Sequence, residues 1–133
     1  MKYHLLLIFV FSSTFLFAQN KDINYSVKYT FSGVIDGYDH EEQLRVFVDG
    51  KLIAESPVKR LSKVNKFKFK VPEGKHTVQF QSYILYNGNW EAFLKENNYS
   101  LDAMYTKEVD LLKQKKQNIA LHFDIKNATV NEQ

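Results

Sequence analysis

The chain contains no cysteine, which excludes disulfide bridges, thiol catalysis and a lipid-modified cysteine behind a leader. It also lacks a strong charge imbalance, and a formal net charge of +3 is too small to indicate nucleic acid as the partner. It has no Gly-x-Ser-x-Gly motif, no internal repeat and no low-complexity linker. What remains is one small domain that must be stabilised by apolar burial.

The first 18 residues are typical of a secretory signal peptide. Lys2 supplies a positive charge, residues 5–17 are mostly apolar, and Ala18 offers a small residue for cleavage. The apolar run is short for a membrane span, although an uncleaved anchor is the alternative. We therefore expect a bacterial protein exported to the periplasm or beyond, without a membrane span once residues 1–18 are removed.

Apolar and polar residues alternate through most of the segment 44–85, which is typical of half-buried strands. Asp49-Gly50 predicts a hairpin turn. Pro72 to Lys75 predicts a tight turn that pairs the strand before it with residues 76–86. Shorter alternating runs occur at 24–35, 104–112 and 118–125.

These runs predict an all-β fold, an antiparallel two-sheet β-sandwich of about seven strands, immunoglobulin-like or transthyretin-like. Residues 91–96 favour at most one short helical turn. We expect a single sandwich domain over residues 19–126 and a flexible C-terminal tail over 127–133.

Residues 46–80 carry a recognisable order of turn motifs. Val48-Asp49-Gly50-Lys51 is followed by Ser56-Pro57 and then by Pro72-Glu73-Gly74-Lys75-His76-Thr77-Val78. In this order the segment resembles the PEGA family of small extracytoplasmic β-domains. The resemblance implies a binding or spacing module of the cell surface, and it implies no catalytic residue.

The alternation stops between Tyr86 and Tyr99, where aromatic and amide side chains gather in an expected loop. Such a loop can stack on a sugar ring or anchor a protein partner. The alternative is that its aromatic side chains close one end of the sandwich. The candidate binding residues are Tyr86, Trp90, Phe93 and Tyr99.

Alternate lysines on the run 66–70 form a second candidate surface, made of Lys66, Lys68 and Lys70. Lysines on an edge strand protect it against pairing with another sheet. The functional alternative is contact with an anionic glycan or lipid.

The acidic and histidine residues do not define a metal or catalytic site. The acidic loop 36–42 lacks the EF-hand spacing, so calcium is only an alternative. His40, His76 and His122 are not at ligand spacing from one another. We expect no metal, no cofactor and no catalytic residue.

The sequence thus predicts an exported, non-catalytic module that binds an envelope protein or glycan. One alternative is a small envelope hydrolase that uses loop carboxylates, with Asp36, Glu42, Glu91 and Asp102 as candidates. Another is an accessory subunit that docks by adding a strand to a sheet edge.

Overall fold

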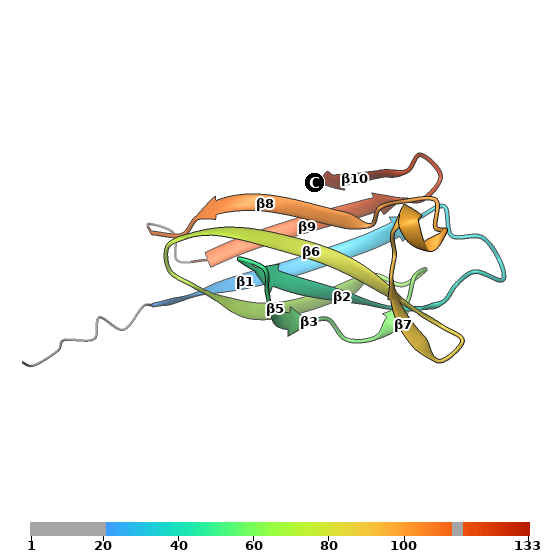
Figure 1. The fold of residues 1–133 in the computed structure, drawn as a ribbon. Helices are drawn as coiled ribbons and strands as arrows, with labels where there is room; N and C mark the ends of the chain where they lie inside the picture. Colours follow the sequence, from blue (N-terminus) through green and yellow to red (C-terminus); the bar gives the residue numbers. More distant parts are fainter. Residues whose placement is uncertain (1–20, 113–115) are drawn as a thin grey trace, which may run out of the picture.

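The computed structural model describes residues 21–112 and 116–133. Its ten strands form two packed sheets, and one short 3₁₀ helix lies outside them, so the predicted β-sandwich is confirmed (Figure 1). The predicted signal peptide, residues 1–18, lies outside the described residues. The elements are β1 (Asp22–Ser32), β2 (Glu41–Val48), β3 (Lys51–Glu55), β4 (Lys59–Arg60), β5 (Asn65–Pro72), β6 (Lys75–Tyr86), β7 (Asn89–Ala92), η1 (Lys95–Asn97), β8 (Met104–Asp110), β9 (Lys116–Asp124) and β10 (Thr129–Glu132).

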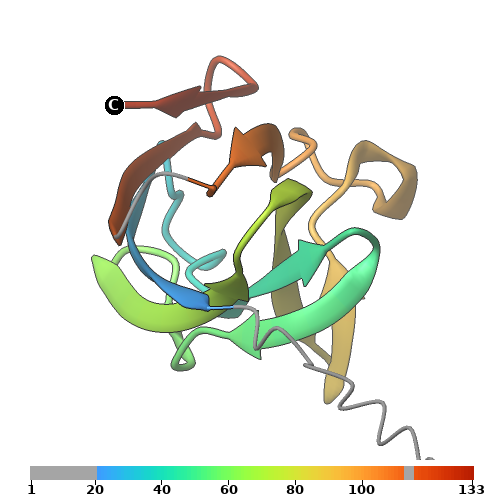
Figure 2. The ribbon, with the colours of Figure 1, turned by 90° about the vertical axis from the view of Figure 1, so that its left-hand side faces the viewer.

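One sheet has four strands in the order β10-β9-β1-β5. The other contains β3-β2-β6-β7, with β4 also paired to β2 and β8 also paired to β6. Figure 2 shows these two layers facing each other. The pairing of β1 with β9 is parallel, so the smaller sheet is mixed rather than wholly antiparallel.

The Asp49-Gly50 hairpin is confirmed. Both residues have positive φ, 51° and 81°, which is the backbone that a two-residue hairpin turn between β2 and β3 requires.

The expected pairing across Pro72–Lys75 is wrong. β5 pairs with β1, whereas β6 pairs with β2, β7 and β8, so this turn carries the chain from one sheet to the other. Gly74, at φ 124°, provides the reversal. The apolar faces on either side of the turn therefore meet across the core instead of lying side by side in one sheet.

The core is filled from both sheets by large aromatic side chains. Tyr25 stacks on Phe69 at 5.1 Å between ring centroids and lies 6.2 Å from Phe80 of the opposite sheet. At the other end, Phe31 stacks on Phe123 at 4.6 Å. Burial of several such rings stabilises a domain that has no disulfide.

The expected tail 127–133 is corrected, because Thr129–Glu132 form β10 against β9. Glu132 also accepts hydrogen bonds from Lys107 Nζ at 2.8 Å and Tyr105 Oη at 2.7 Å, both on β8 of the other sheet. The short strand therefore joins the two sheets at one side of the sandwich. The burial of Val130 against the core explains why this segment is ordered.

Candidate functional site

The 33–40 connection meets two later segments, the β6–β7 hairpin and the residues around η1, at one end of the sandwich (Figure 1). Between them lies a pocket of about 560 Å³, hereafter the aromatic pocket. It is lined by Gly33, Val34, Ile35, Tyr38, His40, Leu61, Ile84, Tyr86, Glu91, Phe93, Asn97, Asn98, Tyr99, Ser100 and Ile125. Its size and its mixture of apolar walls with a few polar groups are typical of ligand sites.

Residues that tolerate positive φ direct the backbone around this pocket. Gly33 has φ 80°, and a Cβ there would lie 2.9 Å from the backbone nitrogen of Lys126. Asn87 and Gly88, with φ 50° and 79°, close the β6–β7 hairpin. Asn98 ends η1 in the left-handed conformation at φ 68°.

The mouth of the pocket exposes apolar side chains. Ile35 and Tyr38 are each 66% exposed, and Tyr86 is 49% exposed. The His40 ring lies edge-on to both tyrosines, at 6.3 Å from Tyr38 and 5.7 Å from Tyr86. The His40 ring thus contacts both exposed tyrosines at the mouth.

The floor of the pocket belongs to the core. Phe93 is 4% exposed, stacks on Phe31 at 5.9 Å and lies 4.8 Å from Tyr99. Tyr99 donates a hydrogen bond to Glu91. The pKa of the Tyr99 hydroxyl is raised, mainly by burial and to a smaller extent by this hydrogen bond. A ligand therefore meets a fixed base and a more exposed rim.

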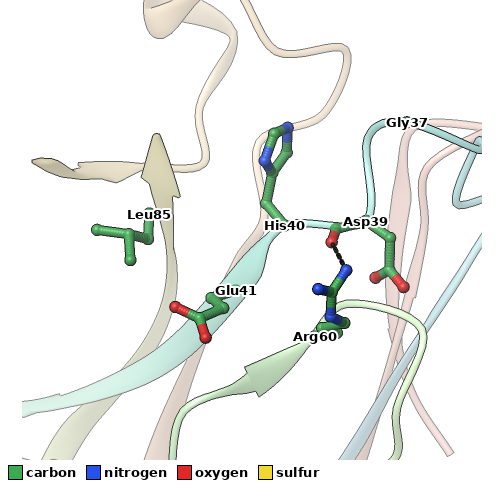
Figure 3. Close-up of a pocket in the computed structure, with 6 residues that line it drawn as sticks. All are labelled: Gly37, Asp39, His40, Glu41, Arg60 and Leu85. Carbon is green, nitrogen blue, oxygen red and sulfur yellow. Dashed lines mark hydrogen bonds between the residues drawn. The ribbon is translucent and has the colours of Figure 1, made fainter. Parts of the chain in front are cut away.

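A second, more polar hollow of about 410 Å³ adjoins the mouth and shares His40 with it. Figure 3 shows its lining, in which Arg60 Nη1 donates to the backbone oxygen of Asp39 at 3.3 Å. The Asp39 carboxylate accepts hydrogen bonds from Ser62 N at 2.9 Å and Ser62 Oγ at 2.6 Å, which lower its pKa. These bonds fasten the connection that precedes β2 to the turn between β4 and β5.

The four predicted binding residues divide between two places. Tyr86, Phe93 and Tyr99 line the aromatic pocket, but Trp90 does not. Trp90 is half-buried on β7, opposite Leu85, so its expected position in a loop is wrong. The Asn87-Gly88 turn reverses the chain, so residues 89–92 form β7 and pair with β6. The expected single helical turn is present as η1, which begins only at Lys95 and lies at Lys95–Asn97.

The four carboxylates of the hydrolase alternative do not share the aromatic pocket. Glu91 lines it, whereas Glu42 is buried on β2 and Asp102 accepts a hydrogen bond from Lys95 N at 2.9 Å. Asp36 is not part of the lining. Within residues 21–112 and 116–133, no group of three or more acidic, histidine or cysteine residues could hold a metal ion.

The three histidines among the described residues occupy separate environments. His40 lies at the pocket mouth, and His122 contacts Thr30 Oγ1 at 3.0 Å and Ser32 Oγ at 2.9 Å across β1 and β9. His76 Nδ1 lies 2.6 Å from Asp49 Oδ2, and this hydrogen bond raises the pKa of His76. Each histidine thus has its own local partners.

A buried polar cluster was not predicted from the sequence. Tyr29 Oη donates to Glu42 Oε1 at 3.0 Å, lies 2.9 Å from Ser56 Oγ and accepts from Asn65 Nδ2 at 2.8 Å. Glu42 is 2% exposed, and burial raises its pKa to about 8. A signal was present, because Glu42 is in phase with the core residues Leu44, Val46 and Val48.

The predicted lysines lie elsewhere. Lys66, Lys68 and Lys70 are exposed on the outer face of β5, which is an edge strand as the sequence indicated. They are separate from the aromatic pocket, whose lining contains no lysine.

Comparisons with family models, with curated proteins and with solved structures found no match for this chain. The resemblance to the PEGA family therefore stays a prediction. Among the described residues, no helix has the length and apolar character needed to cross a bilayer.

Proposed function

We propose that this protein is an exported, non-catalytic, PEGA-like β-sandwich that binds an envelope protein through the aromatic pocket. The observation that carries the proposal is the exposed apolar rim, where Ile35 and Tyr38 surround a pocket of about 560 Å³. Exposed apolar groups beside a pocket with a buried base are typical of interface hot spots. A protruding side chain of the partner would fill the pocket, and the rim would exclude water around it.

A neutral glycan is the second candidate ligand. The exposed Tyr86 ring and the Asn98 side chain, both in the pocket lining, favour it. A tyrosine face stacks on the apolar face of a sugar, and an amide both donates to and accepts from its hydroxyls.

Two other functions have less support. A hydrolase needs two carboxylates across one cleft, and only Glu91 of the four candidates lines the pocket. Docking by strand addition favours a long edge without lysine. The edge strand β5 carries three lysines, and the lysine-free edge strands β7 and β10 have only four residues each.

The test uses a photocrosslinking amino acid at Tyr38, incubated with native envelope fractions. We expect one crosslinked protein of defined mass. The same group at Leu52, which is 42% exposed on β3 and outside the pocket, should not capture it. Equal crosslinking from both positions would refute a partner site at the pocket.

A pair of double variants then measures the energetic contribution of the rim. Ile35→Ser with Tyr38→Ser should weaken partner binding by roughly 30-fold or more, as expected for hot-spot residues worth about 2 kcal/mol. Leu52→Ser with Val58→Ser removes similarly exposed apolar groups outside the pocket and should leave binding unchanged. If the partner is a glycan, purified oligosaccharides will bind directly, and Tyr86→Ala will abolish that binding.

A further inference from the structure

The outer face of the four-stranded sheet places lysines from three neighbouring strands side by side. The strand register aligns three rows across β5, β1 and β9. These rows are Lys70–Asn24–Lys116, Lys68–Ser26–Asn118 and Lys66–Lys28–Ala120. We call this surface, with its five lysines, the basic face.

The geometry of a sheet determines the spacing of these charges. Neighbouring strands are about 4.8 Å apart and successive rows on one face about 6.7 Å apart. Lys28 and Lys66 stand directly opposite one another, an arrangement of like charges that destabilises a sheet. Edge protection accounts for lysines on β5, but Lys28 lies on β1, which has a neighbour on each side.

The three rows contain no acidic side chain. The nearest acidic side chains on the same face are Asp22, beyond the first row, and Asp124, beyond the last. Gln133, whose backbone nitrogen donates to Ala120 O at 2.8 Å, also borders the face. Asp124 already accepts hydrogen bonds from Asn127 N and Nδ2 at 3.0 and 2.7 Å. Within the described part of the chain, none of the five lysines makes an ion pair.

The basic face is also hollowed. A shallow depression of about 570 Å³ is lined by Lys28, Lys66 and Lys68 together with Ser26, Asn118 and Ala120. The small side chains along its floor leave room between the flanking lysines. Ser26 and Asn118 add hydroxyl and amide groups that can bond to a polar ligand.

We propose that the basic face binds a linear polysaccharide that carries carboxylate groups. The lysine rows supply positive charges that recur along the strands, and a carboxylate in each gap would offset the repulsion between Lys28 and Lys66. The hydroxyl of Ser26 and the amide of Asn118 can hydrogen-bond to sugar hydroxyls. A membrane surface fits less well, because the three rows contain no aromatic or large aliphatic side chain to enter a bilayer.

This surface is distinct from the aromatic pocket, and the two linings share no residue. If binding of a partner protein at the aromatic pocket is refuted, polysaccharide binding at the basic face can still be tested. If polysaccharide binding is refuted, the proposal for the aromatic pocket is unaffected.

The test measures binding of the full exported chain to polygalacturonate by calorimetry at several salt concentrations. We expect affinity to fall as salt rises, because each lysine–carboxylate pair that forms releases counterions. The variant Lys28→Gln/Lys66→Gln/Lys68→Gln should bind at least tenfold more weakly at low salt. Its slope of log K against log salt should be shallower by about 2, because each lysine that binds a single-stranded polyanion contributes roughly 0.7 to the slope.

The matched control is Lys51→Gln/Lys75→Gln/Lys95→Gln, which changes the net charge equally at exposed lysines outside the basic face. It should bind like the wild type. Both variants should melt no lower than the wild type, since the substituted side chains are exposed and lack ion pairs among the described residues.

Three results would overturn the proposal. The first is equal weakening by the two triple variants, because the effect would then be one of net charge alone. The second is binding of phosphatidylglycerol vesicles without binding of polygalacturonate, which would assign the face to lipid. The third is equal binding of neutral dextran, which would remove the role of the carboxylates.

Discussion

Replacing the buried carboxyl of Glu42 by an amide should stabilise the protein at neutral pH. Glu42 is 2% exposed, and burial raises its pKa from 4.5 to about 8, against a smaller lowering by the Tyr29 hydrogen bond. Between those two values the carboxyl is protonated in the folded chain and ionised in the unfolded chain. The folded state then binds more protons, so stability falls as pH rises through this window.

The magnitude follows from the linkage relation. Each pH unit inside the window costs about 1.4 kcal/mol, so the wild type should lose about 3 kcal/mol between pH 5 and pH 7 relative to Glu42→Gln. The amide oxygen of the variant can still accept from Tyr29 Oη. A loss of this size is a large part of the 5–15 kcal/mol that is typical of a domain.

The assay is urea unfolding of the wild type, Glu42→Gln and Glu41→Gln at pH 5, 6 and 7. Glu41→Gln is the matched control, because Glu41 is the exposed neighbour on the same strand. Subtracting its curve removes the contributions of other titrating groups, including His76. Parallel pH profiles for the wild type and Glu42→Gln would refute a buried, protonated Glu42.

Three further experiments test the fold around the site by chemical denaturation. Phe93→Ala should lower the free energy of unfolding by about 3–5 kcal/mol, because Phe93 is a buried core ring. Trp90→Ala, at a half-buried position, should lower it clearly less. Equal losses of stability would contradict the assigned positions. Gly33→Ala should destabilise by more than Gly37→Ala, although both have positive φ, because only the Cβ at Gly33 meets a backbone nitrogen; similar losses would contradict this close approach. Removing residues 129–133 should cost about 1–3 kcal/mol through loss of β10, and an unchanged stability would show that the segment is a free tail.

Most strands were predictable from local pattern, and their partners were not. The alternation over 44–48 and the Asp49-Gly50 turn together specify the β2–β3 hairpin, because turn and strands are adjacent in sequence. The Pro72–Lys75 turn led to a wrong pairing, because a tight turn can join two strands of one sheet or pass between sheets. The parallel pairing of β1 with β9 joins residues more than 90 positions apart, and no local signal predicts it.

The candidate sites show the same division. Tyr86, Phe93 and Tyr99 were identified from composition, yet Ile35 and Tyr38 join them only because the 33–40 connection returns to that end of the sandwich. The acidic composition of residues 36–42 predicts a polar loop that includes Glu42, although Glu42 is in phase with the buried residues of β2. The composition of this segment indicates a solvated carboxylate, whereas the two-residue period of β2 indicates the buried position that the structure shows.

The sequence by itself determined most of the strands and which of their faces is apolar, because both depend on neighbours two positions apart. The short strands β7 and β10 were not among them, because four residues carry too little alternation. It also determined that Lys66, Lys68 and Lys70 share one face. Only the tertiary structure decided that Lys28 and Lys116 join that face and that the pocket forms at the end of the sandwich. Those outcomes depend on how separate strands are registered, and register is determined by burial over the whole core.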